Sequence, residues 1–348
     1  MVNMSNQLNL LNVIQIFLNR TILVVSVLLL NAVNAMAQTI TQERFITDMV
    51  ERHQFDKSYL EYLFNHAKVR KSIIKAMTPH PTGKAKPWYQ YRRIFIQDQR
   101  ISDGVAFWHN HASILKRAEA TYGVPPQIII AIIGVETLYG QNQGNFRVID
   151  ALVTLSFHSS RRADFFREEL EHYLLLTREE GFDPLQLQGS YAGAMGIGQF
   201  MPSSFRSYAV DFDGDGRRDI WNNYADAIGS VANYFHRFGW QSGQPIVKAT
   251  QINPTALDTL LGLAFEPKYT LTQLQQFGLK YHGDELANTS GLFIDLETEQ
   301  GPAYWLGFQN YYVITRYNHS KNYAMAVYQL AQEIAHQYAQ ENSLLESN

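Results

Sequence analysis

The fold depends most on one stretch of sequence, PPQIIIAIIGVETLYG at residues 125–140. Two prolines stand where a helix begins, because the fixed φ of proline suits the first helical turn. The apolar run that follows predicts a helix from Gln127 to Tyr139, which Gly140 ends.

Glu136 interrupts this apolar run. It shares one helical face with three isoleucines, Ile129, Ile132 and Ile133. A carboxylic acid on an apolar face is costly to ionise, so we expect its pKa to rise, as a general acid working near neutrality requires. The alternative is a glutamate that reaches solvent or pairs with a buried arginine.

A glycine-rich segment, GSYAGAMGIGQF, follows at residues 189–200. No predicted strand precedes its G-x-x-G-x-G spacing, so it is not a dinucleotide-binding fingerprint. Small residues let a backbone approach a neighbour closely. The segment therefore favours a functional position for Glu136.

The remaining sequence predicts a mainly α, α+β protein. Helical spacing runs from Gln42 to about Ala120, continues from Tyr122 to Gly239, and returns from Ser320 to about Asn342. Four segments between the last two helical regions predict short strands: 245–251, 292–296, 303–308 and 311–317. We expect one small β-rich unit in a helical protein.

Composition excludes several classes of function. Of 348 residues, 46% are hydrophobic and 18% are charged, which is typical of a globular protein. The net charge of −3 with no basic run argues against nucleic acid as a partner. The absence of cysteine excludes disulfides, thiolate metal sites and a lipoprotein anchor.

The N-terminus has the features of an export signal at residues 1–37. Arg20 precedes an apolar stretch from Thr21 to Leu30, and an A-x-A cleavage site ends at Ala37. We therefore expect a periplasmic or secreted protein, with an uncleaved membrane anchor as the alternative.

Several segments together resemble the lytic murein transglycosylase B family. They are GVETLYG at 134–140, GSYAGAMGIGQFMPSS at 189–204, DAIGSVANYF at 226–235, and TRYN at 315–318 with the following Tyr323. The resemblance implies a lysozyme-like catalytic core at 121–241, a helical domain at 38–120 completed by 319–348, and a small β-rich domain at 242–318.

The resemblance also implies the reaction and the residues that perform it. Glu136 would protonate the oxygen of the β-1,4 bond between N-acetylmuramic acid and N-acetylglucosamine, then accept the proton of the muramyl C6 hydroxyl as a 1,6-anhydro ring closes. Ser190 would hydrogen-bond Glu136, and Arg162 would meet the peptide stem. Five further residues would line the sugar groove: Tyr91, Gln199, Tyr234, Asn318 and Tyr323. Core packing is the alternative for each tyrosine, and a backbone contact is the alternative for Ser190.

Residues 211–219, DFDGDGRRD, predict a calcium site. Acids stand at positions 1, 3, 5 and 9 of an EF-hand loop, with glycine at position 6. Position 12 is Asn222, and the family uses an acid farther along a lengthened loop. The expected ligands are the carboxylates of Asp211, Asp213, Asp215 and Asp226 and the carbonyl of Arg217. We expect a structural Ca²⁺, with Na⁺ as a substitute and with helix N-capping as the alternative for Asp226.

Two other functions stay open at this point. A muramidase would hydrolyse the same bond with water, and a non-catalytic protein would bind the wall in a calcium-dependent way. We expect peptidoglycan strands with peptide stems as the partner, further contacts with wall-synthesis proteins, and a monomer.

Overall fold

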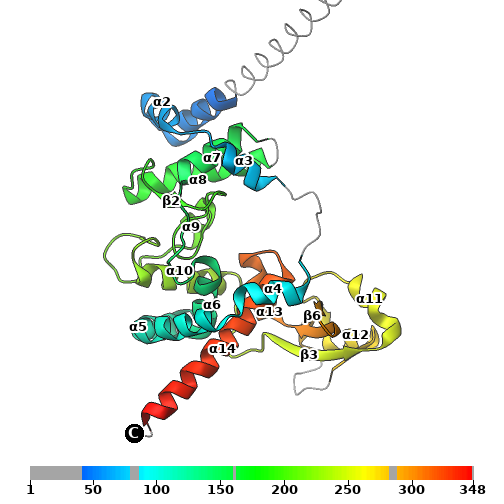
Figure 1. The fold of residues 1–348 in the computed structure, drawn as a ribbon. Helices are drawn as coiled ribbons and strands as arrows, with labels where there is room; N and C mark the ends of the chain where they lie inside the picture. Colours follow the sequence, from blue (N-terminus) through cyan, green and yellow to red (C-terminus); the bar gives the residue numbers. More distant parts are fainter. Residues whose placement is uncertain (1–40, 79–85, 160–161, 282–287, 347–348) are drawn as a thin grey trace, which may run out of the picture.

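The structure is a computed structural model that describes residues 41–78, 86–159, 162–281 and 288–346. Over these residues the chain is mainly helical, with a five-stranded antiparallel sheet at one side (Figure 1). The expected mainly α fold class with a small β-rich unit is therefore confirmed. The predicted export signal lies outside the described residues.

The helices form two groups. The group at the top of Figure 1 contains a helix over residues 41–53, α2 (Lys57–His66), α3 (Lys71–Met77), α7 (Val148–Phe157), α8 (Ala163–Glu180) and α9 (Pro202–Tyr208). The lower group contains α4 (Trp88–Phe95), α5 (Asp98–Tyr122), α6 (Pro126–Thr137), α10 (Tyr224–Arg237), α13 (Gln309–Tyr317) and α14 (Lys321–Glu346). No single helix in the described ranges has the length and apolar character of a membrane span. Helices α5 and α6 reach that length and apolar character only when taken together, and the chain bends by 113° between them.

Helix α6 lies in the core of the lower group, where it contacts α5, α10 and α14. Every residue from Ile128 to Gly134 is buried, so the helix is enclosed around its circumference rather than on one face. It ends at Thr137, two residues earlier than predicted, because Leu138 and Tyr139 both adopt left-handed backbone angles, with φ of 52° and 60°. Glu136 thus sits in the last turn of a core helix.

The first and the last described segments of the chain pack in different places. Helix α14 packs on α4, α5 and α6. Residues 41–78 instead pack against the α7–α8 side, where the buried Asp150 accepts hydrogen bonds from the Lys68 N–H at 2.9 Å and from Arg70 Nε at 3.1 Å. The predicted domain boundaries stay a prediction.

The sheet connects the main core to a smaller one. Its order is β4 (Tyr269–Thr270), β6 (Ser290–Thr298), β7 (Gly301–Gly307), β3 (Val247–Ile252) and β5 (Leu279–Lys280). In β6, Leu292, Ile294 and Leu296 join the main core, whereas Phe293 joins the small core, as the two-residue period of a strand dictates. The small core also receives residues of η1 (Pro254–Ala256), α11 (Leu257–Leu261) and α12 (Leu271–Gln276).

The strand predicted over residues 311–317 is wrong, because these residues form α13. Their tyrosine, valine, isoleucine and threonine side chains favour strands in isolation. Burial decides otherwise: Tyr311 and Ile314, three residues apart, are both fully enclosed on one helical face. The helix ends at Tyr317, whose hydroxyl contacts the glycine-rich segment, and Asn318 follows as its C-cap.

The glycine-rich segment packs tightly against the chain that follows α6. Strand β2 (Gln188–Gly189) pairs with β1 (Phe146–Arg147), and Gly144 lies so close that a Cβ there would be 2.1 Å from the Gly189 carbonyl oxygen. The φ of Gly144 is +92°, which other residues rarely adopt. The expected close approach of the backbone is confirmed.

We predict that Gly144→Ala destabilises the protein far more than Gly181→Ala. Both glycines have positive φ, but a Cβ at Gly181 would meet nothing within 4 Å. The Gly181 variant should therefore lose about 1 kcal/mol from backbone strain alone, and the Gly144 variant more than about 3 kcal/mol because backbone atoms must also move. Urea denaturation measures both, and equal losses would contradict the packing described.

Candidate active site

Glu136 is a partly buried carboxyl with one hydrogen-bond partner among the described side chains. The Tyr323 hydroxyl, from α14, donates to Glu136 Oε1 at 2.5 Å. Burial raises the pKa of Glu136 from 4.5 to about 7, and the hydrogen bond from Tyr323 opposes that rise. A pKa close to neutrality suits a carboxyl that must both give and take a proton.

Three tyrosines from three helices surround this carboxyl. Tyr91 comes from α4, Tyr317 from α13 and Tyr323 from α14. Burial raises the pKa of each phenol, and the negative charge of Glu136 is the next largest cause for all three. They stay neutral hydrogen-bond donors, so burial rather than a charged partner controls the protonation of Glu136.

Tyr317 belongs to the site, although we did not predict it as a site residue. Its hydroxyl donates to the Gly198 carbonyl at 2.5 Å and so joins α13 to the glycine-rich segment. The signal was present, because Tyr317 stands inside the TRYN segment at 315–318.

Thr137 fixes the end of α6 and was also missed. Its hydroxyl donates to the Ile197 carbonyl at 2.8 Å and accepts from the Gly140 N–H at 3.0 Å. The two left-handed residues that follow turn the chain sharply, and the Tyr139 hydroxyl donates to the Arg100 carbonyl at 2.7 Å. Such strain persists only where surrounding contacts enforce it, so this turn holds Glu136 in place.

Ser190 and Gln199 shape the glycine-rich segment. The Ser190 oxygen accepts hydrogen bonds from the N–H groups of Ala192, at 3.3 Å, and Ala194, at 3.0 Å. The bond expected from Ser190 to Glu136 is not among the hydrogen bonds of the described residues, and the backbone contact that was the alternative is present. Gln199, with φ of 53°, donates to the carbonyls of Gln143 and Gly196.

The other predicted sugar- and stem-binding residues differ in their exposure. Tyr234 is only 7% exposed and donates to the Arg316 carbonyl at 2.6 Å, which favours core packing over a sugar contact. Asn318 is exposed at the end of α13. Arg162 is exposed before α8, with its guanidinium 4.1 Å from the centre of the Phe165 ring.

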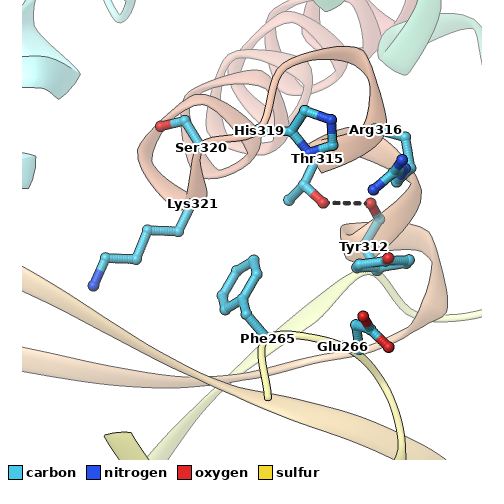
Figure 2. A pocket seen from close by; sticks show the side chains of 8 residues that line it. All are labelled: Phe265, Glu266, Tyr312, Thr315, Arg316, His319, Ser320 and Lys321. Atoms are coloured by element: carbon cyan, nitrogen blue, oxygen red, sulfur yellow. Dashed lines mark hydrogen bonds between the residues drawn. The ribbon is translucent and has the colours of Figure 1, made fainter. Parts of the chain in front are cut away.

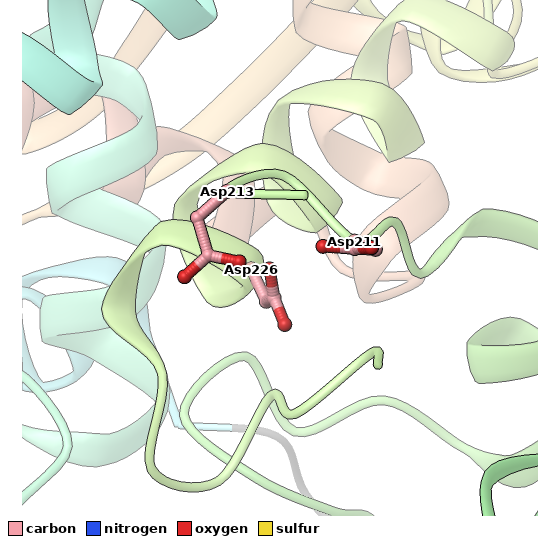
Figure 3. A group of neighbouring side chains, drawn as sticks. All are labelled: Asp211, Asp213 and Asp226. Carbon is pink, nitrogen blue, oxygen red and sulfur yellow. The ribbon is translucent and has the colours of Figure 1, made fainter. Parts of the chain in front are cut away.

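Three carboxylates converge in the loop between α9 and α10. Oxygens of Asp211, Asp213 and Asp226 lie within 4.8 Å of one another (Figure 3). Asp226 is fully buried, and its pKa is raised by burial and by the charges of Asp213 and Asp211, against hydrogen bonds from two backbone N–H groups. No arginine or lysine within the described ranges forms an ion pair with these three acids.

The other predicted ligands of this loop lie nearby. The Asp215 carboxylate accepts from the Arg217 N–H at 2.9 Å and stands outside the three-acid group. The Arg217 guanidinium lies 5.2 Å from the centre of the Phe182 ring. This contact involves the side chain, whereas the predicted ligand is the backbone carbonyl. The N-cap of α10 is Asn223 and not Asp226, because the Asn223 side chain accepts from the first backbone N–H groups of the helix.

We predict that Tyr323→Phe raises the pKa of Glu136 above its value of about 7. The Tyr323 hydroxyl donates to the carboxylate and so stabilises its charged form; without it, burial acts unopposed. Carboxyl carbon NMR shifts followed over pH measure this pKa. Tyr62→Phe, at an exposed tyrosine, is the matched control, and an unchanged or lower pKa in Tyr323→Phe would contradict the geometry.

The sequence matches a known family model and a known relative. The model described as the transglycosylase SLT domain matches residues 38–332. The membrane-bound lytic murein transglycosylase B of Escherichia coli (strain K12) is 45% identical over 303 residues, which are 84% of this chain and 82% of that protein.

Solved structures show the same fold. Soluble lytic transglycosylase SltB1 from Pseudomonas aeruginosa has a TM-score of 0.82 and 48% identity, covering 86% of this chain and 99% of that one. Escherichia coli Slt35 in complex with calcium has a TM-score of 0.76 and 42% identity, covering 86% and 94%. Pseudomonas aeruginosa SltB3 in complex with NAG-anhNAM-pentapeptide has a TM-score of 0.75 and 29% identity, covering 86% and 79%. The expected lysozyme-like core is thereby confirmed, and the chain belongs to the transglycosylase SLT domain family.

Proposed function

We propose that this protein is a peptidoglycan lytic transglycosylase in which Glu136 acts first as general acid and then as general base. Family membership supports the activity. The observation that carries the assignment to Glu136 is its pKa of about 7, caused by burial in the last turn of α6. Among the described residues, no other carboxylate contributes to that shift.

The geometry supports the first step, which breaks the glycosidic bond. The Tyr323 hydroxyl donates a hydrogen bond to Oε1 of Glu136, whereas Oε2 has no hydrogen-bond partner in the described part of the chain. The protonated carboxyl gives its proton to the bridging oxygen between N-acetylmuramic acid and N-acetylglucosamine, and the C1–O bond of the muramyl residue breaks. The hydrogen bond from Tyr323 then stabilises the carboxylate that is left.

The second step needs no second carboxylate. A standard glycosidase uses two carboxyl groups about 5–9 Å apart, one of which activates water or attacks the sugar. Here the C6 hydroxyl of the same muramyl residue attacks C1, and Glu136 takes its proton, so the acid is regenerated and no water is consumed. A nucleophile on the same sugar ring has the advantage of intramolecular reactions.

The substrate is peptidoglycan with peptide stems. The relative that binds NAG-anhNAM-pentapeptide supports this class of ligand. We assign Tyr91, Gln199 and Asn318 to the sugar groove, with Ser190 beside Glu136 and Arg162 toward the stem. Such a substrate is consistent with the periplasmic location that the N-terminal sequence predicts.

We assign a structural Ca²⁺ to the loop between α9 and α10. Asp211, Asp213 and Asp226 would hold it, because three unneutralised carboxylates within 4.8 Å repel one another unless a cation lies between them. Asp215 and the Arg217 carbonyl complete the proposed set. The calcium complex of the Escherichia coli relative supports the choice of metal.

We predict that Glu136→Gln lowers the rate of sacculus digestion by roughly 10²–10⁴-fold, because proton transfer contributes that much to such reactions. Glutamine keeps the shape and can still accept from Tyr323, so the fold should be retained. Glu61→Gln, at an exposed glutamate of α2, is the matched control.

Mass spectrometry of the wild-type digest identifies the reaction. Anhydro-muramyl ends, lighter by one water than reducing ends, are expected. Reducing ends alone would instead indicate a muramidase. Intact sacculi with wild-type protein, and with Glu136→Gln indistinguishable from it, would indicate a wall-binding protein without activity.

We predict that Ca²⁺ raises the free energy of unfolding and that Asp213→Asn removes this effect. At a concentration one hundred times its Kd, a ligand specific to the folded state contributes about 2.7 kcal/mol. Thermal unfolding with Ca²⁺ and with chelator measures it. Asp258→Asn, at an exposed acid of α11, should respond like wild type; equal responses of the wild type and Asp213→Asn would argue against the site.

A further inference from the structure

A cavity of about 520 Å³ lies along α5, beside the turn that follows α6 and the first residue of α10. The turn contributes Tyr139 and Gln141, and α10 contributes Tyr224. Helix α5 contributes one face, whose members follow helical spacing: Asp103, Ala106, Phe107, Asn110 and His111. The volume lies within the range of ligand sites, about 300–1,000 Å³. None of the residues assigned above to proton transfer, to the sugar groove or to the metal loop lines this cavity.

Four aromatic rings pack together at the base of the cavity. The centre of the His111 ring lies 4.5 Å from that of Phe107 and 4.6 Å from that of Tyr224. Phe107 in turn lies 5.6 Å from both Tyr139 and Tyr224. Phe107 and Tyr139 are buried, whereas His111 and Tyr224 are partly exposed. These two rings therefore offer an apolar surface, supported from behind, to a ligand in the cavity.

The polar groups around these rings keep free hydrogen-bonding capacity. In the described part of the chain, the side-chain amides of Asn110 and Gln141 and the ring nitrogens of His111 form no hydrogen bond. Asp103 accepts from Gln99 at 2.8 Å through one oxygen and keeps the other oxygen free. Burial lowers the pKa of His111 from 6.5, so its imidazole is neutral at pH 7 and offers one donor and one acceptor. The rim can thus both donate and accept.

The charge and the donor pattern of the cavity favour a neutral, hydroxyl-rich ligand. Asp103 carries a charge, and no arginine or lysine of the described residues lines the cavity, which argues against an anion. The cavity between α13 and the loop before β4 differs, because Arg316 and Lys321 line it (Figure 2). An ammonium group only donates hydrogen bonds, whereas a hydroxyl both donates and accepts, as amides and a neutral imidazole do. A saccharide, with hydroxyls at its edge and C–H groups on its faces, matches both the rim and the rings.

A second cavity, of about 560 Å³, adjoins the first at Gln141, which lines both. It offers the side-chain amides of Gln186 and Gln188, which form no hydrogen bond within the described ranges, and the partly exposed ring of Phe182. Its charged residues, Arg217 and Asp219, have opposite signs. Two adjoining cavities with this shared chemistry suit several linked sugar units rather than a single one.

We propose that these two cavities bind a saccharide chain outside the catalytic groove. The rings of His111 and Tyr224 pack on one sugar unit, and the amides of Asn110 and Gln141 bond its hydroxyls. The identification of this saccharide as a peptidoglycan strand rests on the proposed function. A second contact on the same polymer raises the local concentration of cleavable bonds at Glu136, even when the contact itself is weak.

Calorimetric titration of chitotetraose into the full chain with Glu136→Gln tests the proposal. Two classes of binding site are expected, one in the catalytic groove and one in the cavities. Ala106→Trp fills the first cavity without removing a polar group, so it should abolish one class. Ala120→Trp, at an exposed alanine of α5 that does not line the cavity, should keep both. Phe265→Trp, which adds bulk to the cavity of Figure 2, should also keep both.

Two further variants leave the cavity open and test its polar contacts. Asn110→Ala and Gln141→Ala should each weaken the second class roughly fivefold, the effect of one lost hydrogen bond. In the chain that retains Glu136, Ala106→Trp should lower kcat/KM on insoluble sacculi severalfold and leave kcat/KM on short soluble glycan fragments unchanged. Unchanged cleavage of the soluble fragments would show that the fold and the catalytic groove are intact.

The proposal is overturned if Glu136→Gln shows a single class of site, if Ala106→Trp retains both classes, or if neither amide variant changes an affinity. Spermidine, a cationic probe for Asp103 and the rings, should leave the titration unchanged; displacement of the sugar from the second class would assign the cavity to an amine instead. Failure of the wild type to cleave sacculi would refute the proposed function. The titration would still decide the role of the cavities, because binding of chitotetraose does not depend on cleavage.

Discussion

The arrangement of this protein depends on enclosing α6, a helix with no polar face. Such a helix is stable only when neighbours cover its whole circumference, and α5, α10 and α14 do so. Its last turn carries Glu136, so the same enclosure that stabilises the core withdraws a carboxyl from water. The raised pKa of this residue is in that sense a by-product of core packing, adjusted by one phenol.

The residues around Glu136 are distant from one another in the sequence, and each also makes a contact that holds the fold together. Tyr317 joins α13 to the glycine-rich segment, and Thr137 joins α6 to the same segment. Tyr323 connects α14 to Glu136. Because these bonds hold both the fold and the end of α6, the position of the Glu136 carboxyl is fixed by several independent elements rather than by a mobile loop.

Features that depend on the spacing of nearby residues could be predicted from the sequence. Features that depend on contacts between distant residues could not. The position of Glu136 among buried residues was predicted because its apolar neighbours are three, four and seven residues away, and the acidic loop because its aspartates stand two residues apart. The helix at 311–317 was missed since burial of Tyr311 and Ile314 outweighs strand propensity. Thr137 was missed because its partner, Ile197, is sixty residues away. N-capping of α10 was only the alternative role for Asp226; Asn223 caps the helix instead, and the Asp226 carboxylate accepts from the Phe212 N–H of the loop.

The hydrogen bond between Tyr323 and Glu136 can form only late in the synthesis of the chain. The two residues are separated by 187 positions, so the ribosome adds Tyr323 long after Glu136. At about 5–20 residues per second, this delay is roughly ten to forty seconds. Throughout it, the nascent chain has its acid but lacks the helix that covers and orients it. Glu136 can therefore acquire the surroundings that raise its pKa only when synthesis of the chain is almost finished.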